Sequence, residues 1–332
     1  MVGYEDALAY GVGWKNQDES FCDMYQVSGH YPAVYGWDIG DIHRSVNLDT
    51  VPFDDIVSWI QEIHIHGGIN TISWHMDNPV NGNSSWDNSK IAKEILPGGN
   101  YHKAFLEKLD LAAAFFKKCK IGDTYIPIIF RPFHEHNGNW FWWGRGNFEE
   151  SEYIDVYRFT ADYLKHHHDI HHLIYAYSPD RSRLANPTDS TGYFWGYPGD
   201  DYVDILGIDN YHDVRVHSID SLNITGARGL RASVEMVYKL AEERGKVAAL
   251  TETGAEGIKD SQWFTKRLLE PITGSENKIK LAYVLMWRNA NTKHHYMVYP
   301  GHMANKDFNL FINDPATLSL DDVGKNFEVS DQ

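Results

Sequence analysis

Two glutamates and a tryptophan-rich stretch carry the residue types that could do chemistry. Residues 125–144 read YIPIIFRPFHEHNGNWFWWG, in which Glu135 follows His134 and comes shortly before Trp140. A carboxyl group among histidine and indole rings suits a pocket that keeps an acid protonated and stacks flat, partly apolar rings such as sugars. A structural alternative is a buried Glu135 paired with Arg131, because ion pairs also perturb carboxyl groups.

A second candidate carboxyl, Glu252, lies between two threonines at the end of a later apolar run. Hydrolysis of a glycosidic bond requires two carboxyl groups across one pocket: one protonates the leaving oxygen, and the other attacks the anomeric carbon or activates water. A separation of about 5–5.5 Å predicts retention of configuration, and about 6.5–9.5 Å predicts inversion. We expect a hydrogen bond from Tyr211 and the positive potential of Arg288 to keep Glu252 ionised. Alternatively, Glu252 merely ends a strand.

Short apolar strands alternate with amphipathic helices along the chain. Strands are predicted at 7–14, 33–38, 69–75, 126–130, 172–180, 203–211, 246–252 and 281–287. Helices are predicted at 22–31, 52–66, 101–120, 153–168, around 230–241, at 263–269 and near 315–323. Because each parallel strand needs a crossover helix, this order predicts an α/β fold, a (β/α)8 TIM barrel forming one catalytic domain over residues 1–332. An open doubly wound sheet is the alternative, but no GxGxxG or GxxxxGK[ST] supplies its usual phosphate turn.

The predicted barrel brings distant polar residues together, because barrel active sites lie at the carboxyl ends of the strands. The predicted strand ends carry Asp38, His75, Glu135, Asp180, Asp209, Tyr211, Glu252, Trp287 and Arg288. Glu135 and Glu252 are the only glutamates among them. Taken together with the aromatic residues, this pair favours bond cleavage over two unrelated structural carboxylates.

Composition excludes several classes of partner. Lys+Arg 30 against Asp+Glu 46 gives a formal net charge of -16, which disfavours nucleic acid and anionic membrane surfaces. Tryptophan at 11 and tyrosine at 20 fit a neutral, polyhydroxylated ligand. Cys22 and Cys119 allow at most one disulfide. No apolar run reaches about 18 residues, so no membrane insertion is predicted, and the N-terminal residues do not have the pattern of a signal peptide.

The motif FRPFHEHNGNWFWWG at 130–144, together with TETG at 251–254, resembles glycoside hydrolase family 26 β-mannanases. YGWD, SWH, YSPD, DNYH and MWRN after other predicted strands fit the same pattern. The resemblance implies cleavage of β-1,4-mannosidic bonds with retention, Glu135 as acid/base and Glu252 as nucleophile, without a cofactor. It also implies substrate contacts by His75, Trp86, His134, Trp140, Tyr211, Trp287 and Arg288.

This chain departs from that family at one place, because Val12-Gly13-Trp14 stands where the first strand typically ends in His-Gln. β-Glucanases and β-1,3-xylanases share the core motif and remain alternatives, as does a glycan-binding barrel without catalysis. A metal-dependent hydrolase is a weaker rival: His134-Glu135-His136 is not HExxH, and the histidine run 166–168 lies at a helix end, so no metal is expected.

The resemblance and the substrate class also predict the partner and the compartment. We expect a β-mannan polysaccharide or manno-oligosaccharide as the partner, a monomeric protein, and export to the periplasm or the medium, where polysaccharides are met. Endo- or exo-action depends on whether the loops 78–100 and 289–306 close one end of the cleft, and tolerance of galactose branches stays open.

Overall fold

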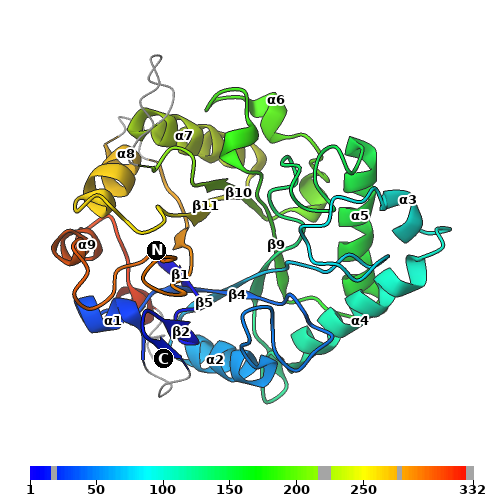
Figure 1. Cartoon of the computed structure of the whole chain (residues 1–332), viewed down its shortest axis with the longest axis horizontal. Coiled ribbons are helices and arrows are strands. Elements are labelled where there is room, and N and C mark those ends of the chain that lie inside the picture. Colours follow the sequence, from blue (N-terminus) through cyan, green and yellow to red (C-terminus); the bar gives the residue numbers. More distant parts are fainter. Residues whose placement is uncertain (16–20, 216–225, 275–278, 327–332) are drawn as a thin grey trace, which may run out of the picture.

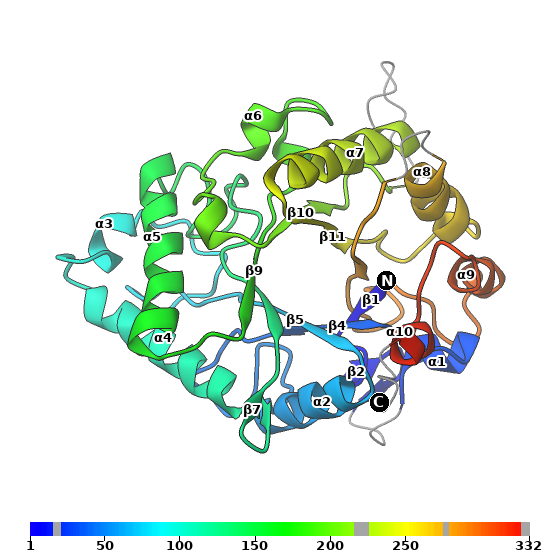
Figure 2. The same cartoon turned by 180° about the vertical axis from the view of Figure 1, so that it is seen from behind.

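Eight parallel strands close into a barrel with helices around its outside, as Figure 1 and Figure 2 show from opposite sides. The computed structural model describes residues 1–15, 21–215, 226–274 and 279–326. Around the barrel the strands follow the order β1, β4, β5, β8, β9, β10, β11 and β12, and β12 pairs again with β1. Each strand therefore neighbours the next one along the chain, which confirms the predicted (β/α)8 fold.

The barrel strands are short and mostly buried, as their apolar runs predict, and β9 is the most exposed of them. Their bounds are β1 (Val2–Glu5), β4 (Val34–Asp38), β5 (Ile69–Ser73), β8 (Ile128–Arg131), β9 (Leu173–Tyr177), β10 (Ile205–Asn210), β11 (Val247–Thr253) and β12 (Val284–Met286). Two small antiparallel hairpins lie outside the barrel: β2 (Tyr10–Gly11) with β3 (Trp14–Lys15), and β6 (Lys120–Ile121) with β7 (Thr124–Tyr125).

The helices bury one apolar face against the strands, and the helical segments predicted at 22–31, 52–66, 101–120, 153–168, around 230–241 and at 263–269 lie near those residues. The α-helices are α1 (Asp23–Ser28), α2 (Phe53–Ile65), α3 (Ala92–Ile95), α4 (His102–Lys118), α5 (Glu150–Asp162), α6 (Ser190–Tyr193), α7 (Ala227–Arg244), α8 (Glu270–Thr273), α9 (Asn305–Ile312) and α10 (Leu320–Asn326). The π-helices are η1 (Tyr163–His167) and η4 (Trp263–Leu269), and the 3-10 helices are η2 (Arg181–Arg183) and η3 (Asp200–Tyr202). Gly245 ends α7 at φ 64°, a left-handed conformation that glycine adopts without strain.

Two predicted elements at the ends of the chain are wrong. The first strand is β1, and residues 7–14 instead form a turn and most of the β2–β3 hairpin. Val12-Gly13-Trp14 is therefore not the end of the first strand. The first strand ends at Glu5, so a third glutamate joins Glu135 and Glu252 at the strand ends. The last predicted helix, near 315–323, is also misplaced, because the chain forms α9 first and begins α10 only at Leu320.

Buried apolar side chains from the strands fill the interior of the barrel. Six strands each contribute one residue to a buried cluster of Val34, Ile129, Ala176, Ile205, Ala249 and Leu285. Near the carboxyl ends, the register between β10 and β11 shifts: Ile208 pairs with Leu250, but Asp209 pairs with Glu252. Such bulges are frequent beside active sites because they redirect side chains. Here the bulge places two carboxyl groups side by side.

Among the described residues, no helix is both long enough and apolar enough to cross a membrane. The two cysteines are buried and free, so the one disulfide that the sequence allowed does not form.

Candidate active site

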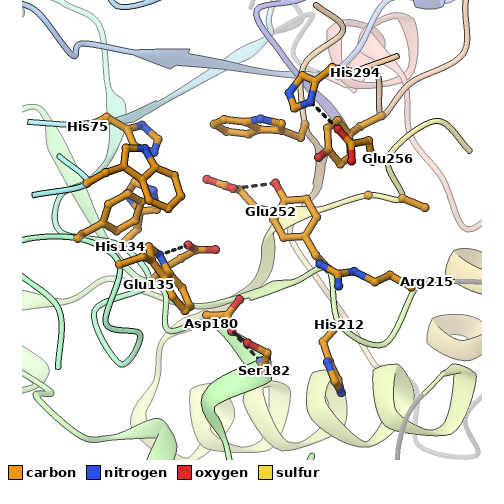
Figure 3. Close-up of a pocket in the computed structure, with 18 of the residues that line it drawn as sticks. His75, His134, Glu135, Asp180, Ser182, His212, Arg215, Glu252, Glu256 and His294 are labelled. Atoms are coloured by element: carbon orange, nitrogen blue, oxygen red, sulfur yellow. Dashed lines mark hydrogen bonds and ion pairs between the residues drawn. The ribbon is translucent and has the colours of Figure 1, made fainter. Parts of the chain in front are cut away.

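A cleft of about 1000 Å³ opens at the carboxyl ends of the barrel strands. Figure 3 shows its labelled side chains converging on one space. Eight of the nine predicted site residues line it: His75, Trp86, His134, Glu135, Trp140, Tyr211, Glu252 and Trp287. The ninth, Arg288, lines an adjoining chamber of about 340 Å³ that shares His75, Trp86, Trp287 and His294 with the cleft.

The two predicted catalytic glutamates face each other. One carboxylate oxygen from each of Glu135, Asp209 and Glu252 lies within 4.8 Å of the other two. Figure 3 shows Glu135 and Glu252 pointing into the same part of the cleft. Glu135 follows β8 and Glu252 lies on β11, so the barrel brings together residues 117 positions apart in the chain. This upper limit on the oxygen–oxygen distance lies nearer to the separation of a retaining pair, about 5–5.5 Å, than to that of an inverting pair, about 6.5–9.5 Å.

The surroundings of Glu135 favour its protonated form. Burial, followed by the negative charges of Asp180 and Asp209, raises the pKa of Glu135 well above its usual range. One contact acts in the opposite direction: the indole N–H of Trp140 donates a hydrogen bond to Glu135 Oε2 at 2.9 Å, which favours the ionised form. Next to it, burial and then the Arg131 charge lower the pKa of His134 well below its ordinary value. The neutral His134 leaves Glu135 without a neighbouring cation on that side.

The backbone at Glu135 is in a conformation that non-glycine residues rarely adopt, with φ 52°. Phe133, two residues earlier, has the same φ. Strained backbone of this kind clusters at functional sites, where the surrounding structure holds it in place. Here a hydrogen bond from the backbone N–H of Glu135 to the carbonyl of Ser178, at 2.8 Å, is one of the contacts that hold the turn.

Glu252 is surrounded by donors. The hydroxyl of Tyr211 donates to Glu252 Oε2 at 2.8 Å, as the sequence predicts. The buried Arg131 guanidinium pairs with Glu252 Oε1 through Nη2 and with Asp209 Oδ2 through Nη1, the latter at 2.9 Å. Thr251 Oγ1 donates to the other oxygen of Asp209 at 2.7 Å. Arg131 therefore pairs with Glu252 and Asp209, and the alternative of a structural Glu135–Arg131 pair is not found.

The expectation that Arg288 supplies positive charge at Glu252 is wrong. Its Nη1 lies 2.8 Å from Asp49 Oδ1 and 3.1 Å from the hydroxyl of Tyr10, in the adjoining chamber. The sequence places Arg288 next to Trp287, but it does not reveal a partner about 240 residues away. Sequence reasoning also missed Asp49 and Glu5 as lining residues of this chamber. For Glu5 a signal was present, because it follows the short apolar run Val2-Gly3-Tyr4.

His75 is held by Asp38, the last residue of β4. His75 Nδ1 lies 2.7 Å from Asp38 Oδ2. Burial alone would lower the pKa of His75, but the charge of Asp38 and this hydrogen bond raise it above its ordinary value. For Asp38, burial opposes the effect of His75, and the net result is a lowered pKa. The contact fixes the orientation of the His75 ring at the floor of the cleft.

The tryptophans of the 125–144 stretch divide into two groups. Trp142 and Trp143 are fully buried, and their indole N–H groups donate to the carbonyls of Met76 and His134. They therefore pack the loop. Trp140 lines the cleft with the Arg183 guanidinium 4.8 Å from its ring centroid, and Trp86 lies on the rim with 61% of its surface exposed.

Further charged residues line the cleft that sequence reasoning did not select as site residues. His294 Nδ1 lies 2.7 Å from Glu256 Oε1. This contact joins the loop after β12 to the loop after β11. His212 and Arg215 come from the loop after β10 and are labelled in Figure 3. His212 is the last residue of the DNYH motif at 209–212, but Arg215, Glu256 and His294 lie in irregular loops where the sequence offered no motif signal.

Three groups in the described part of the chain bring together possible metal ligands. Glu135, Asp209 and Glu252 form one of them, but Arg131 already contacts two of these carboxylates, so a cation is in place there. A second group, Asp41, His43 and Asp77, has the Lys108 ammonium 3.4 Å from Asp77. The third group comprises Asp110, His167 and His168, away from the cleft.

Comparisons with known proteins match this architecture. The chain is 37% identical over 319 residues to the mannan endo-1,4-beta-mannosidase of Bifidobacterium adolescentis, covering 89% of this chain but only 31% of that protein. A mannan endo-1,4-beta-mannosidase of Bacillus subtilis (strain 168) is 29% identical over 283 residues, 79% of this chain and 67% of that protein. This chain thus spans about a third of the length of the Bifidobacterium relative.

Solved structures agree over almost the whole chain. A GH26 beta-mannanase from Bacteroides ovatus superposes with a TM-score of 0.87 at 35% identity, covering 97% of this chain and 90% of that one. A Cellulomonas fimi endo-beta-1,4-mannanase double mutant gives 0.88 at 32% identity, covering 98% and 73%. The family model described as "Glycosyl hydrolase family 26" matches residues 9–295. The chain therefore belongs to glycosyl hydrolase family 26.

Proposed function

We propose that this chain hydrolyses β-1,4-mannosidic bonds in mannan, galactomannan or glucomannan with retention of anomeric configuration. The observation that carries the proposal is the pair of carboxyl groups within 4.8 Å in opposite electrostatic surroundings. Such a pair can share the two roles of a retaining glycosidase. The substrate class rests on relatives named as mannan endo-1,4-beta-mannosidases.

The reaction proceeds by double displacement. Glu252, held by Arg131 and Tyr211, attacks the anomeric carbon, while the protonated Glu135 gives its proton to the leaving glycosidic oxygen. The glycosyl group is then covalently bound to Glu252. Glu135, now a carboxylate, removes a proton from an incoming water, which displaces Glu252 and regenerates both groups.

The remaining cleft residues bind the sugar chain. Trp140 lies beside Glu135 and stacks the sugar on the leaving-group side of the cleaved bond. His75, His134 and Trp287 surround the sugar that is attacked. Trp86 and Arg288 contact sugars further along, toward the adjoining chamber.

We further propose that residues 1–332 form one catalytic domain that acts as a monomer. We also propose export to the periplasm or the medium, because polysaccharides such as mannan are met outside the cytoplasm. No cofactor takes part in the proposed steps.

The test uses the purified Glu135→Ala and Glu252→Ala variants with Glu256→Ala, a cleft-rim glutamate, as the control. Reducing-sugar release from mannan falls by orders of magnitude in the first two and only modestly in the control, with unchanged circular dichroism. Parallel assays on mixed-linkage glucan and β-1,3-xylan test the substrate class. Wild-type-like mannan cleavage by either of the first two variants removes that glutamate from the mechanism.

An aryl mannoside with a good leaving group separates the two roles. Such a leaving group needs no proton, so Glu135→Ala still forms the covalent intermediate, and added azide accelerates its breakdown. Glu252→Ala cannot form that intermediate. Equal responses of the two variants to leaving group and azide contradict the assignment of roles.

A further inference from the structure

A histidine-rich turn on the outside of the barrel forms a second cluster of possible ligands. Residues 166–172 read HHHDIHH and connect the end of η1 to β9. Asp110 on α4 lies next to this turn, because it contacts His168, and Figures 1 and 2 show α4 near the helix that leads into the turn. The turn leads into the amino end of β9, whereas the cleft lies at the carboxyl ends of the strands. The cluster is therefore separate from the candidate active site.

Three side chains of this cluster meet around one point. One possible ligand atom from each of Asp110, His167 and His168 lies within 4.8 Å of the other two. His168 Nε2 is 2.7 Å from Asp110 Oδ1. The Tyr163 hydroxyl donates to the same oxygen at 2.8 Å, and its ring stacks on His167 with centroids 4.5 Å apart and planes 13° apart. Tyr163 therefore positions both the carboxylate and one imidazole.

The local backbone explains why two consecutive histidines reach the same carboxylate. Successive residues of an α-helix point about 100° apart, which normally separates neighbouring side chains. Here α5 gives way to the π-helix η1, and His168 is the residue at which that helix ends, with φ -97° and ψ -3°. π-Helical turns are rare and occur frequently at functional sites.

We propose that Asp110, His167 and His168 bind a divalent transition-metal ion, for which Zn²⁺ is the test case. Two imidazole nitrogens and one carboxylate oxygen are ligands that Zn²⁺ accepts, with water in the fourth position. An ion about 2.0–2.2 Å from each donor places the donors roughly 3.4 Å apart in a tetrahedral arrangement. The ion replaces the proton between His168 and Asp110, and His167, which is exposed, turns toward it.

The bound ion would act as a structural link. It joins the middle of α4 to the end of η1, where Asp110 already contacts Tyr163 and His168. Binding to the folded protein alone stabilises that protein by mass action. The distance of the cluster from the cleft means that glycan cleavage does not depend on the ion.

Isothermal titration of the untagged protein with Zn²⁺ tests the proposal, since a polyhistidine tag would bind the ion itself. We expect one ion per cluster and, at about 100 times the dissociation constant, a rise in Tm of about 4 °C. The visible absorption of bound Co²⁺ reports the coordination geometry. Asp110→Asn and His168→Ala each weaken binding at least tenfold.

His171→Ala is the matched control. His171 Nε2 is also 2.7 Å from an aspartate, Asp169, but this pair is not part of the three-ligand cluster. We expect His171→Ala to leave the affinity for Zn²⁺ unchanged. His167→Ala removes only an exposed side chain and keeps the test valid if Asp110→Asn does not fold. Absence of Zn²⁺ binding to the wild type, or full affinity in His167→Ala and His168→Ala, overturns the proposal, as does an equal loss in His171→Ala.

Discussion

The hydrogen bond from Trp140 to Glu135 should set the upper end of the pH range in which the protein is active. The indole N–H lies 2.9 Å from Glu135 Oε2 and stabilises the ionised carboxylate, so it opposes the burial that raises the pKa of Glu135. A hydrogen bond to a charged group contributes about 1.5–3 kcal/mol, and about 1.4 kcal/mol corresponds to one pKa unit. Trp140→Phe therefore raises the pKa of Glu135 by about one to two pKa units.

The consequence appears in the pH profile of kcat/KM. In the proposed mechanism Glu135 has to be protonated when the leaving group departs, so the alkaline limb of the profile reports its pKa. A higher pKa keeps the proton on Glu135 at higher pH, and the alkaline limb of Trp140→Phe moves up by about one to two pH units. Phenylalanine retains an aromatic face for the sugar. The measurement is initial-rate hydrolysis of a soluble mannan below KM across the pH range.

Trp143→Phe provides the control for this experiment. It removes an indole from the same loop, but that indole N–H donates to the carbonyl of His134 and not to a carboxylate. Its alkaline limb should stay where the wild type has it. An unmoved or lowered alkaline limb in Trp140→Phe, or equal shifts in both variants, refutes the reasoning.

Three further substitutions probe the same site. Arg131→Ala leaves two buried carboxylates without their cation and lowers the free energy of unfolding by about 3–5 kcal/mol in urea titrations. Tyr211→Phe removes the hydroxyl that donates to Glu252 and lowers kcat/KM by about 10- to 100-fold. Asp38→Asn removes the ion pair with His75. Because folding raises the pKa of His75 and lowers that of Asp38, the pair stabilises the folded protein most between those two pKa values, and this stabilisation is lost in strong acid and at alkaline pH. Thermal melts should therefore show a larger drop in Tm for Asp38→Asn near about pH 5.5 than near about pH 9.

The barrel could be predicted from the sequence because its signal is repeated eight times. Each strand is an apolar run and each crossover helix has its own amphipathic pattern, so an error in one element leaves the fold class intact. The first strand was misplaced because its apolar pattern was the weakest of the eight. Val2–Glu5 is only four residues long and lies at the start of the chain, and the longer apolar run at 7–14 was assigned in its place.

The residues that line the site could be predicted more easily than their partners. Strand ends are local features, so the barrel rule alone brought His75, Glu135 and Glu252 to one cleft. Partners depend on side-chain direction and on pairs far apart in the chain. Arg288 was expected at Glu252 but pairs with Asp49, and no local pattern in the sequence connects these positions.

The different roles proposed for the two glutamates rest on the position of one arginine. Two carboxyl groups within 4.8 Å cannot both be ionised without a large electrostatic penalty unless a cation compensates them. Arg131, the last residue of β8, points across the barrel toward β10 and β11, where it pairs with Asp209 and Glu252. Glu135 is only four residues further along the chain, but the turn with its left-handed backbone places it beside Trp140 instead. Burial and the nearby carboxylates raise the pKa of Glu135, whereas Arg131 pairs with Glu252, and this difference supports the roles proposed for the two residues.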